Sequence, residues 1–476
     1  MSTARFMAST RYRMIVSVAV ISLGAKSLCG AAAKPSFQFV AAAQPSTLFS
    51  RYTAVGDING DGKLDLVTAD SSGILVTPGN GDGTYQPGVR TPLNDLVTAF
   101  AMADLDGDGR LDLVAYATPQ SVGTSLTILL GNGDGSFRQT GKLTYSGSAP
   151  PQTFAGANPI VLADFDNNGL PDIVIYGQTP SSNTARHDAA ILWLNQGGGT
   201  FGNPITFPLG TPYSSNSSLM VSGDFNNDGN ADLVAANASG TIAVLLGTGD
   251  GSFAAPTTFQ ANLGQAVQLT NLTVADLNRD GKLDLVTAQT WSGVPSDASA
   301  GVYLGNGDGT FASAVLYAPS VVDVYGTTSV YAGSLLLADL TGDGILDLVA
   351  SNYRPSSFGE IIVYPGNGDG TFQPASVYRT AAQANFIAVG DLNADGRVDV
   401  VVTSPSTTSQ LSAIQVLNGS SGPYLRIVVT NSGPVYLDQP TQFSVNVVNM
   451  GDAPTNGTVV LSPGVLTSAA GWTAVM

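Results

Sequence analysis

A nine-residue acidic loop occurs seven times in this chain, and it constrains the fold more than any other feature. The first copy reads D-I-N-G-D-G-K-L-D, from Asp57 to Asp65. Consecutive copies begin roughly 50 to 60 residues apart, a spacing typical of propeller blades among repeat architectures. The loop therefore predicts a repeat protein. The remaining copies begin at Asp104, Asp164, Asp224, Asp276, Asp339 and Asp391.

Every odd position of the loop offers an oxygen atom. Positions 1 and 9 are always Asp, position 5 is Asp except for Asn168, and position 3 is Asp, Asn or, once, Thr341. Position 6 is always Gly, which suits a sharp turn with positive φ. Position 7 has no constant side chain, so its backbone carbonyl is the expected ligand. This pattern matches the beginning of an EF-hand-like calcium loop that is shortened at its end.

We therefore predict up to seven bound Ca²⁺ ions, one in each loop. In the order of positions 1, 3, 5, 7 and 9, the predicted metal ligands are Asp57, Asn59, Asp61, Lys63 and Asp65; Asp104, Asp106, Asp108, Arg110 and Asp112; Asp164, Asp166, Asn168, Leu170 and Asp172; Asp224, Asn226, Asp228, Asn230 and Asp232; Asp276, Asn278, Asp280, Lys282 and Asp284; Asp339, Thr341, Asp343, Ile345 and Asp347; and Asp391, Asn393, Asp395, Arg397 and Asp399.

The alternative is that the Asp and Asn side chains only cap their own backbone as Asx turns. One loop could be such a turn, but seven copies in one register favour calcium. Asn168 and Thr341 mark the two loops that we expect to bind calcium most weakly. Position 2 is apolar in every copy, from Ile58 to Leu392, and so is position 8. We expect both side chains to lie beneath the loop.

The chain is strongly acidic, with a formal net charge of −17 and a pI of about 4.1. This charge argues against nucleic acid as a partner, because phosphate backbones attract cationic proteins. Most of the carboxylates lie in the seven loops and in a second Asp-bearing turn. Bound calcium would therefore cancel most of the formal charge.

Residues 1–33 read as a secretory signal peptide. Three arginines precede an apolar core from Met14 to Leu23, and small residues follow as far as Ala33. The apolar run is too short to span a membrane comfortably. Cys29 is the only cysteine and would leave with the signal. The mature chain is therefore expected to be exported, with no disulfide and no membrane span.

Short apolar runs flank each acidic loop and read as buried strands. A third run leads to a second repeated signature, G-N-G-D-G-[TS]-[FY], as from Gly79 to Tyr85. Its density of Gly and Asn marks a tight hairpin turn, and the aromatic residue would open a fourth strand. Four strands in each of seven units predict an all-β, seven-bladed propeller.

The loops and hairpins together resemble the FG-GAP or VCBS-type repeats of bacterial secreted proteins, which are related to the integrin α-subunit propeller. The resemblance covers residues 34–424 and implies a calcium-binding propeller, often one module of a larger surface or secreted protein. From Leu425 the pattern changes to alternating strands. The stretch N-M-G-D-A-P-T-N-G-T-V from Asn449 resembles the bacterial surface repeats called DUF11. Residues 425–476 would be part of such an immunoglobulin-like module.

The seventh unit lacks its hairpin and its fourth strand. No G-D-G-T-F turn follows the run from Ile414 to Asn418. The segment from Pro35 to Val40 resembles the start of a fourth strand, such as Ser136-Phe137-Arg138. We predict that this segment pairs with the third strand of the seventh blade, which covers an exposed edge and closes the ring.

The predicted strand order places the acidic loops and the hairpins on one face of the disc, the calcium face. Connections of variable length fall on the opposite, variable face: Thr179 to Asp188, Gln289 to Ser299, Tyr317 to Tyr331 and Arg354 to Phe358. Irregular loops on a rigid scaffold commonly carry recognition. We therefore expect a protein or glycan ligand there. The candidate contacts are Trp291, Tyr317, Tyr325, Tyr353 and Arg354.

The sequence shows no catalytic constellation. The only histidine, His187, is expected in a surface loop, and Trp193 in a buried strand. No nucleophile with a base, phosphate-binding loop or zinc spacing is found. We predict a monomeric propeller, secreted or at the cell surface, that acts as a binding, adhesion or scaffold module and not as an enzyme. A glycan-binding lectin is the main alternative, and a polysaccharide lyase or hydrolase is the less favoured one.

Overall fold

The computed structural model consists of β-strands and the turns between them. It describes residues 2–8, 12–18, 38–41, 52–70, 72–118, 124–145, 160–178, 187–212, 219–237, 239–261, 267–291, 294–317, 332–352, 359–380, 384, 386–403, 414–420, 425–431, 441–449 and 472–474. No helix occurs in these ranges. Accordingly, no helix that could cross a membrane is found within them.

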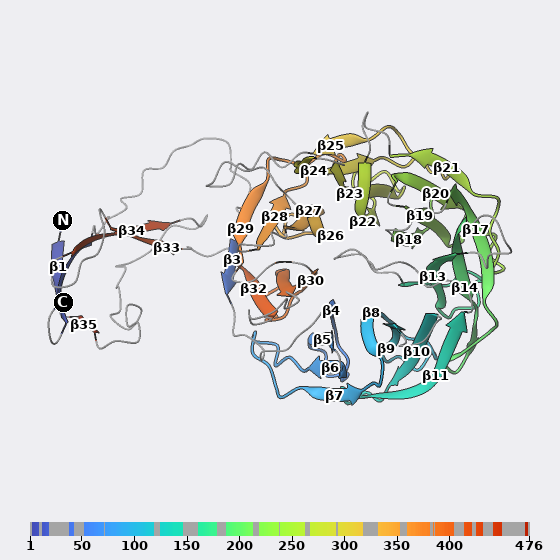
Figure 1. The fold of residues 1–476 in the computed structure, drawn as a ribbon, viewed down its shortest axis with the longest axis horizontal. Coiled ribbons are helices and arrows are strands. Elements are labelled where there is room, and N and C mark those ends of the chain that lie inside the picture. The colour runs from blue at the N-terminus through green and yellow to red at the C-terminus, as the bar shows by residue number, and fades with distance from the viewer. Residues whose placement is uncertain are drawn as a thin grey trace. The chain divides into compact units, whose positions relative to one another are not determined.

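Residues 39–419 form one compact unit, a seven-bladed β-propeller (Figure 1). Each blade is a four-stranded sheet, so the predicted all-β, seven-bladed fold is confirmed. From the centre outward, the blades are: β4 (Tyr52–Gly56), β5 (Asp65–Asp70), β6 (Gly73–Thr77) and β7 (Val89–Pro92); β8 (Leu96–Ala103), β9 (Asp112–Thr118), β10 (Thr124–Gly131) and β11 (Phe137–Tyr145); β12 (Ile160–Ala163), β13 (Asp172–Gln178), β14 (His187–Trp193) and β17 (Ile205–Pro212); β18 (Leu219–Gly223), β19 (Asp232–Ala236), β20 (Thr241–Leu245) and β21 (Thr257–Gln260); β22 (Val267–Ala275), β23 (Asp284–Trp291), β24 (Val294–Tyr303) and β25 (Val315–Tyr317); β26 (Ala332–Ala338), β27 (Asp347–Asn352), β28 (Glu360–Tyr364) and β29 (Ser376–Arg379); and β30 (Phe386–Gly390), β31 (Asp399–Thr403), β32 (Ile414–Ser420) and β3 (Gln38–Ala41).

The second and third strands of the blades are short apolar runs because both of their faces are covered by neighbouring blades. Every residue of β19 and β20 is buried, for example. Trp193 on β14 is 1% exposed, which confirms its predicted place in the core. The innermost strands contact each other in the order β4, β8, β12, β18, β22, β26, β30 and back to β4. The ring is therefore closed.

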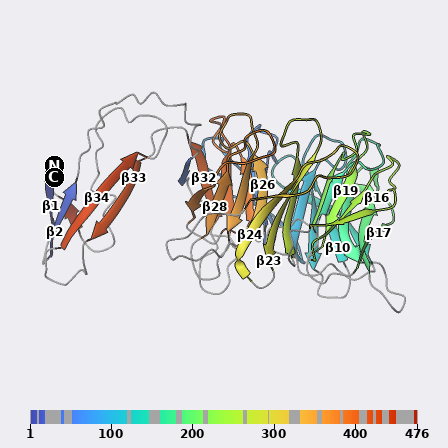
Figure 2. The same ribbon diagram turned by 90° about the horizontal axis from the view of Figure 1, so that it is seen from above.

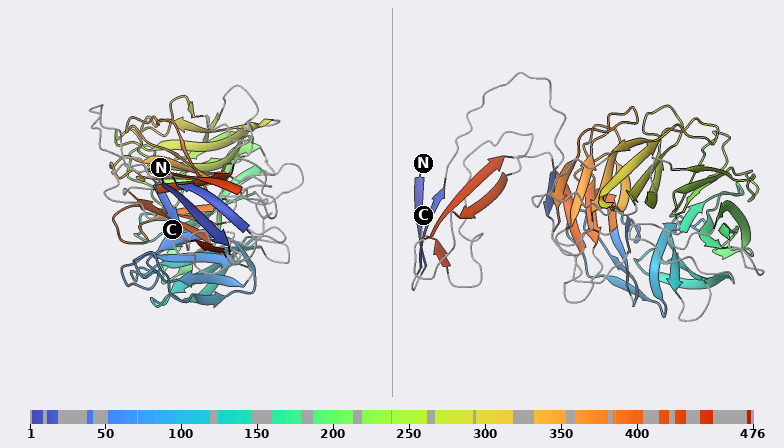
Figure 3. Two further views of the ribbon diagram at one scale, coloured as in Figure 1. Left: turned by 90° about the vertical axis from the view of Figure 1, so that its left-hand side faces the viewer. Right: turned by 45° about the horizontal axis from the view of Figure 1, so that its top comes forward.

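Each acidic loop joins the first strand of a blade to the second, and each hairpin joins the third strand to the fourth. Both turns therefore lie at the same end of the blade, as predicted for the calcium face. Viewed from the edge, the blades stand side by side in a disc (Figures 2 and 3). In four blades the hairpin aromatic forms only a bridge, such as Gly79 to Tyr85, and the fourth strand begins a few residues later than predicted.

The ring closes through β3, which precedes all seven acidic loops in the sequence. β3 lies beside β32 as the outermost strand of blade 7, in the place that the hairpin-connected strand takes in the other blades. The predicted closure is therefore confirmed. Blade 7 is built from two segments that lie far apart in the sequence.

We expect loss of this closing strand to destabilise the entire ring. A chain that begins at Gln44 lacks β3 and leaves the edge of β32 open. Its melting temperature should fall by about 5 °C or more relative to a chain that begins at Lys34 and keeps the strand. Adding a synthetic peptide of residues 36–43 should restore part of the loss. Equal melting temperatures for the two chains would contradict the role of β3.

The remaining described segments form a second unit, which comprises residues 1–38 and 420–476. Its sheet has the order β33 (Leu425–Asn431), β34 (Thr441–Asn449), β2 (Tyr12–Val18), β1 (Ser2–Ala8) and β35 (Trp472–Ala474). β33 and β34 coincide with the alternating runs noted in the tail. The signal peptide and the immunoglobulin-like module stay predictions.

The variable face contains more strand than the sequence suggested. The stretch from Gln289 to Ser299, predicted as an irregular loop, is mostly the paired ends of β23 and β24. Trp291 is therefore the last residue of β23, at the strand end opposite the acidic loop. It pairs with Val294 on the facing strand. Tyr325, Tyr353, Arg354 and most of the other predicted connections lie outside the described residues.

Candidate metal-binding loops and the face they form

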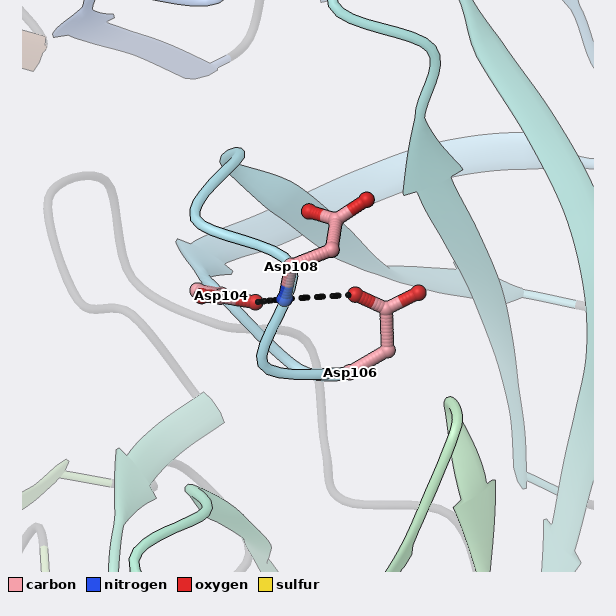
Figure 4. Close-up of side chains that lie close together, drawn as sticks. All are labelled: Asp104, Asp106 and Asp108. Atoms are coloured by element: carbon pink, nitrogen blue, oxygen red, sulfur yellow. Dashed lines mark hydrogen bonds between the residues drawn. The ribbon is translucent and has the colours of Figure 1, made fainter.

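Each acidic loop is one tight turn whose first carboxylate accepts backbone N–H groups from later residues. In the second loop, Asp104 Oδ1 accepts from Gly107 at 2.7 Å and from Asp108 at 3.1 Å, and Oδ2 accepts from Gly109 at 2.8 Å. The Asp108 N–H also lies 3.2 Å from Asp106 Oδ1 (Figure 4). The bond from position 6 to position 1 recurs in all seven loops.

These contacts are the Asx turns that the sequence left open as an alternative. They leave an oxygen for a cation, because Asp104 Oδ2 accepts one hydrogen bond and keeps a second lone pair. In the second loop the turns hold the carboxylates of positions 1, 3 and 5 close together. The observed turn geometry is therefore compatible with calcium binding and with Asx turns alone.

Position 9 has a second role that the sequence did not reveal. Its carboxylate is 0% or 1% exposed in every blade. One oxygen accepts the N–H of loop position 2, and the other accepts the N–H of the residue that opens the hairpin or, in blade 7, of Gly419, all at 2.7 to 3.0 Å. The side chain thus clips the acidic loop to the end of the third strand. The seven clip residues are Asp65, Asp112, Asp172, Asp232, Asp284, Asp347 and Asp399.

Burial makes the clip carboxylates costly to ionise. Desolvation raises the pKa of Asp172 and of Asp399 to about 6, although two backbone hydrogen bonds act in the opposite direction for each group. Neighbouring loop carboxylates, such as Asp166 beside Asp172, raise it further. A cation placed among these groups would favour the charged form of all of them.

The Asp of the hairpin has a different environment. Asp82 is exposed and accepts both the backbone N–H and the hydroxyl of Thr84, at 2.9 and 2.5 Å. These hydrogen bonds lower its pKa. The same arrangement occurs at Asp134, Asp250, Asp308 and Asp369. The hairpin Asp is thus satisfied by its own turn, which explains why the signature pairs it with Thr or Ser.

The glycines of the hairpin are required by two close approaches. A Cβ on Gly307 would lie 3.0 Å from the side chain of Lys282, at position 7 of the same blade's loop. A Cβ on Gly251 would lie 2.8 Å from Leu194 in the preceding blade, and its φ is +79°. The middle glycine of the hairpin therefore leaves room for the acidic loop of its own blade, and the last glycine leaves room for the neighbouring blade. This accounts for the co-occurrence of the two repeated signatures.

Hydrogen bonds also join the turns of neighbouring blades. The N–H of Gly251 donates to the carbonyl of Phe165 in the preceding loop, and Gly309 donates to Phe225, both at 2.9 Å. In blade 3 the side chain of Asn195 replaces this donor and reaches Leu105 O at 2.8 Å. Position 2 of each loop is buried as predicted, and position 8 is half-buried. The turns of blades 2 to 5 are therefore connected to one another.

The loop carboxylates fit a divalent cation with oxygen ligands. Oxygen atoms of Asp104, Asp106 and Asp108 all lie within 4.8 Å of one another, and so do those of Asp164, Asp166 and Asp172. Oxygens on opposite sides of one Ca²⁺ ion are about 5 Å apart at the usual bond lengths. Among the described residues, the buried hydroxyl of Thr341 has no hydrogen-bond partner, so its lone pairs are not used by the protein.

The third loop has the amide of Asn168 at position 5, and this amide makes an additional hydrogen bond to the hairpin. Asn168 Oδ1 accepts the N–H of Leu170, as Asp does in the other loops, and Asn168 Nδ2 donates to Asn195 O at 2.9 Å. The hairpin that follows opens with Asn195 in place of Gly. The two departures from the repeat thus occur together and in contact.

Two residues that the sequence placed in loops lie in strands instead. Tyr317 was expected in a variable loop, but it is the last residue of β25 and packs edge-on against Phe372 at a ring distance of 5.3 Å. Its contact is with the hairpin of the next blade, so it also helps to pack blades 5 and 6 together. His187 is exposed as expected, but it opens β14 and does not lie in a loop.

The fold and these turns define a seven-bladed β-propeller with one acidic loop per blade. The family model for the FG-GAP-like repeat matches residues 57–115, 116–175, 224–287 and 339–402. These ranges span more than half of the chain and contain all seven loops. The chain belongs to the FG-GAP-like repeat family. No curated protein matches it.

Solved propellers resemble the chain at low identity. A lectin of Agrocybe aegerita, described as recognising non-reducing terminal N-acetylglucosamine, is 23% identical, with 74% of this chain and 85% of the lectin covered and a TM-score of 0.49. BBS1N, solved in complex with ARL6DN, is 14% identical, with 80% and 96% covered and a TM-score of 0.47. Identities this low carry no information about a shared ligand.

Proposed function

We propose that this protein is an exported, calcium-stabilised propeller that acts as a binding or scaffold module, with its ligand on the variable face. The observation that supports it best is the calcium face itself. Seven loops hold their position 1 and position 9 carboxylates in one repeated geometry, and buried hydrogen bonds connect each loop to the end of the third strand. A fixed arrangement of this kind suits a scaffold and leaves the opposite face free to differ from blade to blade.

Within each loop, the side chains of positions 1, 3 and 5 would hold calcium, together with the carbonyl of position 7. The position 9 carboxylate would contribute from beneath while it keeps the clip in place. Bound calcium would supply the positive charge that offsets the clustered carboxylates. The residues around the loop already fix the turn, so binding would require little rearrangement.

Calcium binding is tested by a matched pair of substitutions in blade 2. Asp108→Asn removes one charge from the loop, whereas Asp134→Asn removes one from the exposed hairpin nearby. In titration calorimetry of chelator-treated protein, the first should weaken one site by about tenfold, because one charge-assisted ligand is lost. The second should leave the calcium isotherm unchanged. Equal effects would show non-specific attraction to an acidic face, and no heat in the native protein would refute binding.

A glycan ligand is the second candidate, and a groove between blades 4 and 5 favours it; because the hairpin of blade 5 lines this groove, the groove lies at the calcium-face end of the blades. The groove has a volume of about 330 Å³. The rings of Phe259 and Phe311 line it together with the polar side chains of Thr257, Thr258, Gln260, Thr310 and Ser313. Aromatic faces beside hydroxyl groups suit a sugar ring. None of the described residues that line the groove is Arg or Lys, so the groove offers no support for the polysaccharide lyase.

The position of the ligand site is tested on the two faces separately. A glycan array, run beside an assay for the release of unsaturated sugars, would identify a ligand or an activity. We then expect Trp291→Ala to weaken binding tenfold or more with the melting temperature unchanged. Asp82→Ala, in a calcium-face hairpin, should leave binding nearly unaffected. The reverse pattern would place recognition on the calcium face.

A further inference from the structure

The acidic loops of blades 3 and 4 are joined by a hydrogen bond between two side chains. Asn167 Nδ2 donates to Asn230 Oδ1 at 2.8 Å. Asn167 is position 4 of the third loop and lies between the predicted ligands Asp166 and Asn168. Asn230 is position 7 of the fourth loop, and its backbone carbonyl is a predicted ligand there. The hydrogen bond therefore connects the ligand-bearing segments of two neighbouring loops.

Position 4 approaches the next loop at two other blade junctions. A Cβ on Gly107 of the second loop would lie 3.4 Å from Leu170, at position 7 of the third loop. The guanidinium of Arg279 in the fifth loop donates to Gly344 O in the sixth loop. The approach therefore recurs along the ring, and the residue at position 4 decides whether it becomes a hydrogen bond.

The side chain of Asn167 is not needed to form its own turn. Its φ is +57°, in the left-handed region that Asn tolerates and Gly adopts freely. The first, second and sixth loops have Gly60, Gly107 and Gly342 at this position, also with positive φ, and each keeps the hydrogen bond from position 6 to position 1. The amide of Asn167 thus serves the contact with the fourth loop.

We propose that the third and fourth acidic loops bind calcium cooperatively and that the hydrogen bond from Asn167 to Asn230 couples them. The coupling rests on the calcium binding proposed above and adds a form of regulation to it. Two coupled loops fill over a narrower range of calcium concentration than two independent loops. Blades 3 and 4 therefore respond to calcium as a unit.

The coupling acts through the order of the two turns. When positions 3 and 5 of the third loop are held by a shared ion, position 4 between them loses its freedom as well. Its amide then restricts position 7 of the fourth loop, so this loop loses less conformational entropy when it binds its own ion. The effect is reciprocal, because a coupling free energy between two sites acts equally in both directions. Both side chains are neutral amides, so net charge is not involved.

The test follows hydrogen exchange by mass spectrometry while calcium is added to the chelator-treated full chain. Peptides that cover residues 164–172 and 224–232 report the two loops separately, through the position 6 N–H groups bonded to the position 1 carboxylates. The readout is the calcium concentration that gives half of the full protection. In Asn167→Gly this concentration should rise about threefold in the fourth loop, across the lost hydrogen bond. In Asn230→Leu it should rise about threefold in the third loop.

The matched control is Asn227→Gly, the same substitution at position 4 of the fourth loop. Among the described residues, the amide of Asn227 makes no hydrogen bond to the fifth loop, so half-protection of the fifth loop should occur at the native calcium concentration. Both test variants introduce residues that other loops of this chain already have at these positions, Gly107 and Leu170. They are therefore expected to fold, as a melting curve in calcium would verify.

The outcomes separate the coupling from the calcium binding on which it rests. Protection that responds to calcium, with a shift confined to the loop that carries the substitution, would overturn the coupling alone. An equal shift of the fifth loop in the control would also overturn it, because the effect would then come from the added backbone freedom of glycine. Exchange that does not respond to calcium in the native chain would overturn the calcium binding and the coupling together.

Discussion

Removal of calcium is expected to lower the stability of the propeller by on the order of 10 kcal/mol. At ~1 mM calcium and an extracellular-type Kd near 10⁻⁴ M, mass action at one site contributes about 1.4 kcal/mol, and seven sites together account for the total. This amount is comparable to the whole stability of an average domain. Chelation should therefore lower the melting temperature sharply, as measured by calorimetry or circular dichroism.

Readdition of ions separates specific binding from charge screening. Calcium in slight excess over chelator should restore the native melting curve, whereas sodium at the same ionic strength should not. Magnesium should restore less, because it prefers a rigid octahedral site and dehydrates reluctantly. A melting curve that is indifferent to chelator would falsify the calcium hypothesis and leave the loops as Asx turns alone.

Loss of one clip carboxylate is expected to destabilise the fold even without calcium. Asp232 is 0% exposed and accepts the N–H groups of Phe225 and Gly247, at 2.8 and 2.7 Å. Asp232→Ala leaves both N–H groups buried without an acceptor, which should cost about 3 to 5 kcal/mol. Chemical denaturation in the presence of chelator measures this cost directly.

The matched control for this prediction is Asp228→Ala in the same loop. Asp228 is exposed, and it accepts the N–H of Asn230 at 2.8 Å. Its loss should cost less than about 1 kcal/mol in chelator, because solvent can replace the acceptor. With calcium present, the same change should reduce calcium affinity. If the two variants were equally stable in chelator, the clip would have no structural role.

Much of the fold could be predicted because the informative features are local and repeated. The seven loops and the hairpins fix where each blade begins and turns, and the absence of a last hairpin indicated the closing strand. Asn168 and Thr341 were noted as exceptions on the same basis. A repeat reveals itself by comparison of the chain with itself, so no tertiary contact had to be known.

The contacts between blades could not be predicted in the same way. Tyr317 reads as an exposed aromatic in the sequence, and only the packing of blades 5 and 6 brings it against Phe372. The pairing of Asn168 with Asn195 depends on the approach of a loop and a hairpin 27 residues apart. The second role of Asp65 and its equivalents could not be predicted either, because an Asp at position 9 is equally suitable as a metal ligand and as the carboxylate that joins the loop to the third strand.

The pairing of β3 with β32 has a consequence for any longer polypeptide that contains this ring. The chain enters the propeller on one strand and leaves it on the adjacent strand, and neighbouring strands lie about 4.8 Å apart. The ring can therefore be accommodated like a hairpin loop between two strands of a host domain, since it imposes almost no separation on the segments before and after it. A ring of this geometry can be inserted into a surface loop, or removed from it, without moving the two strands of the host domain.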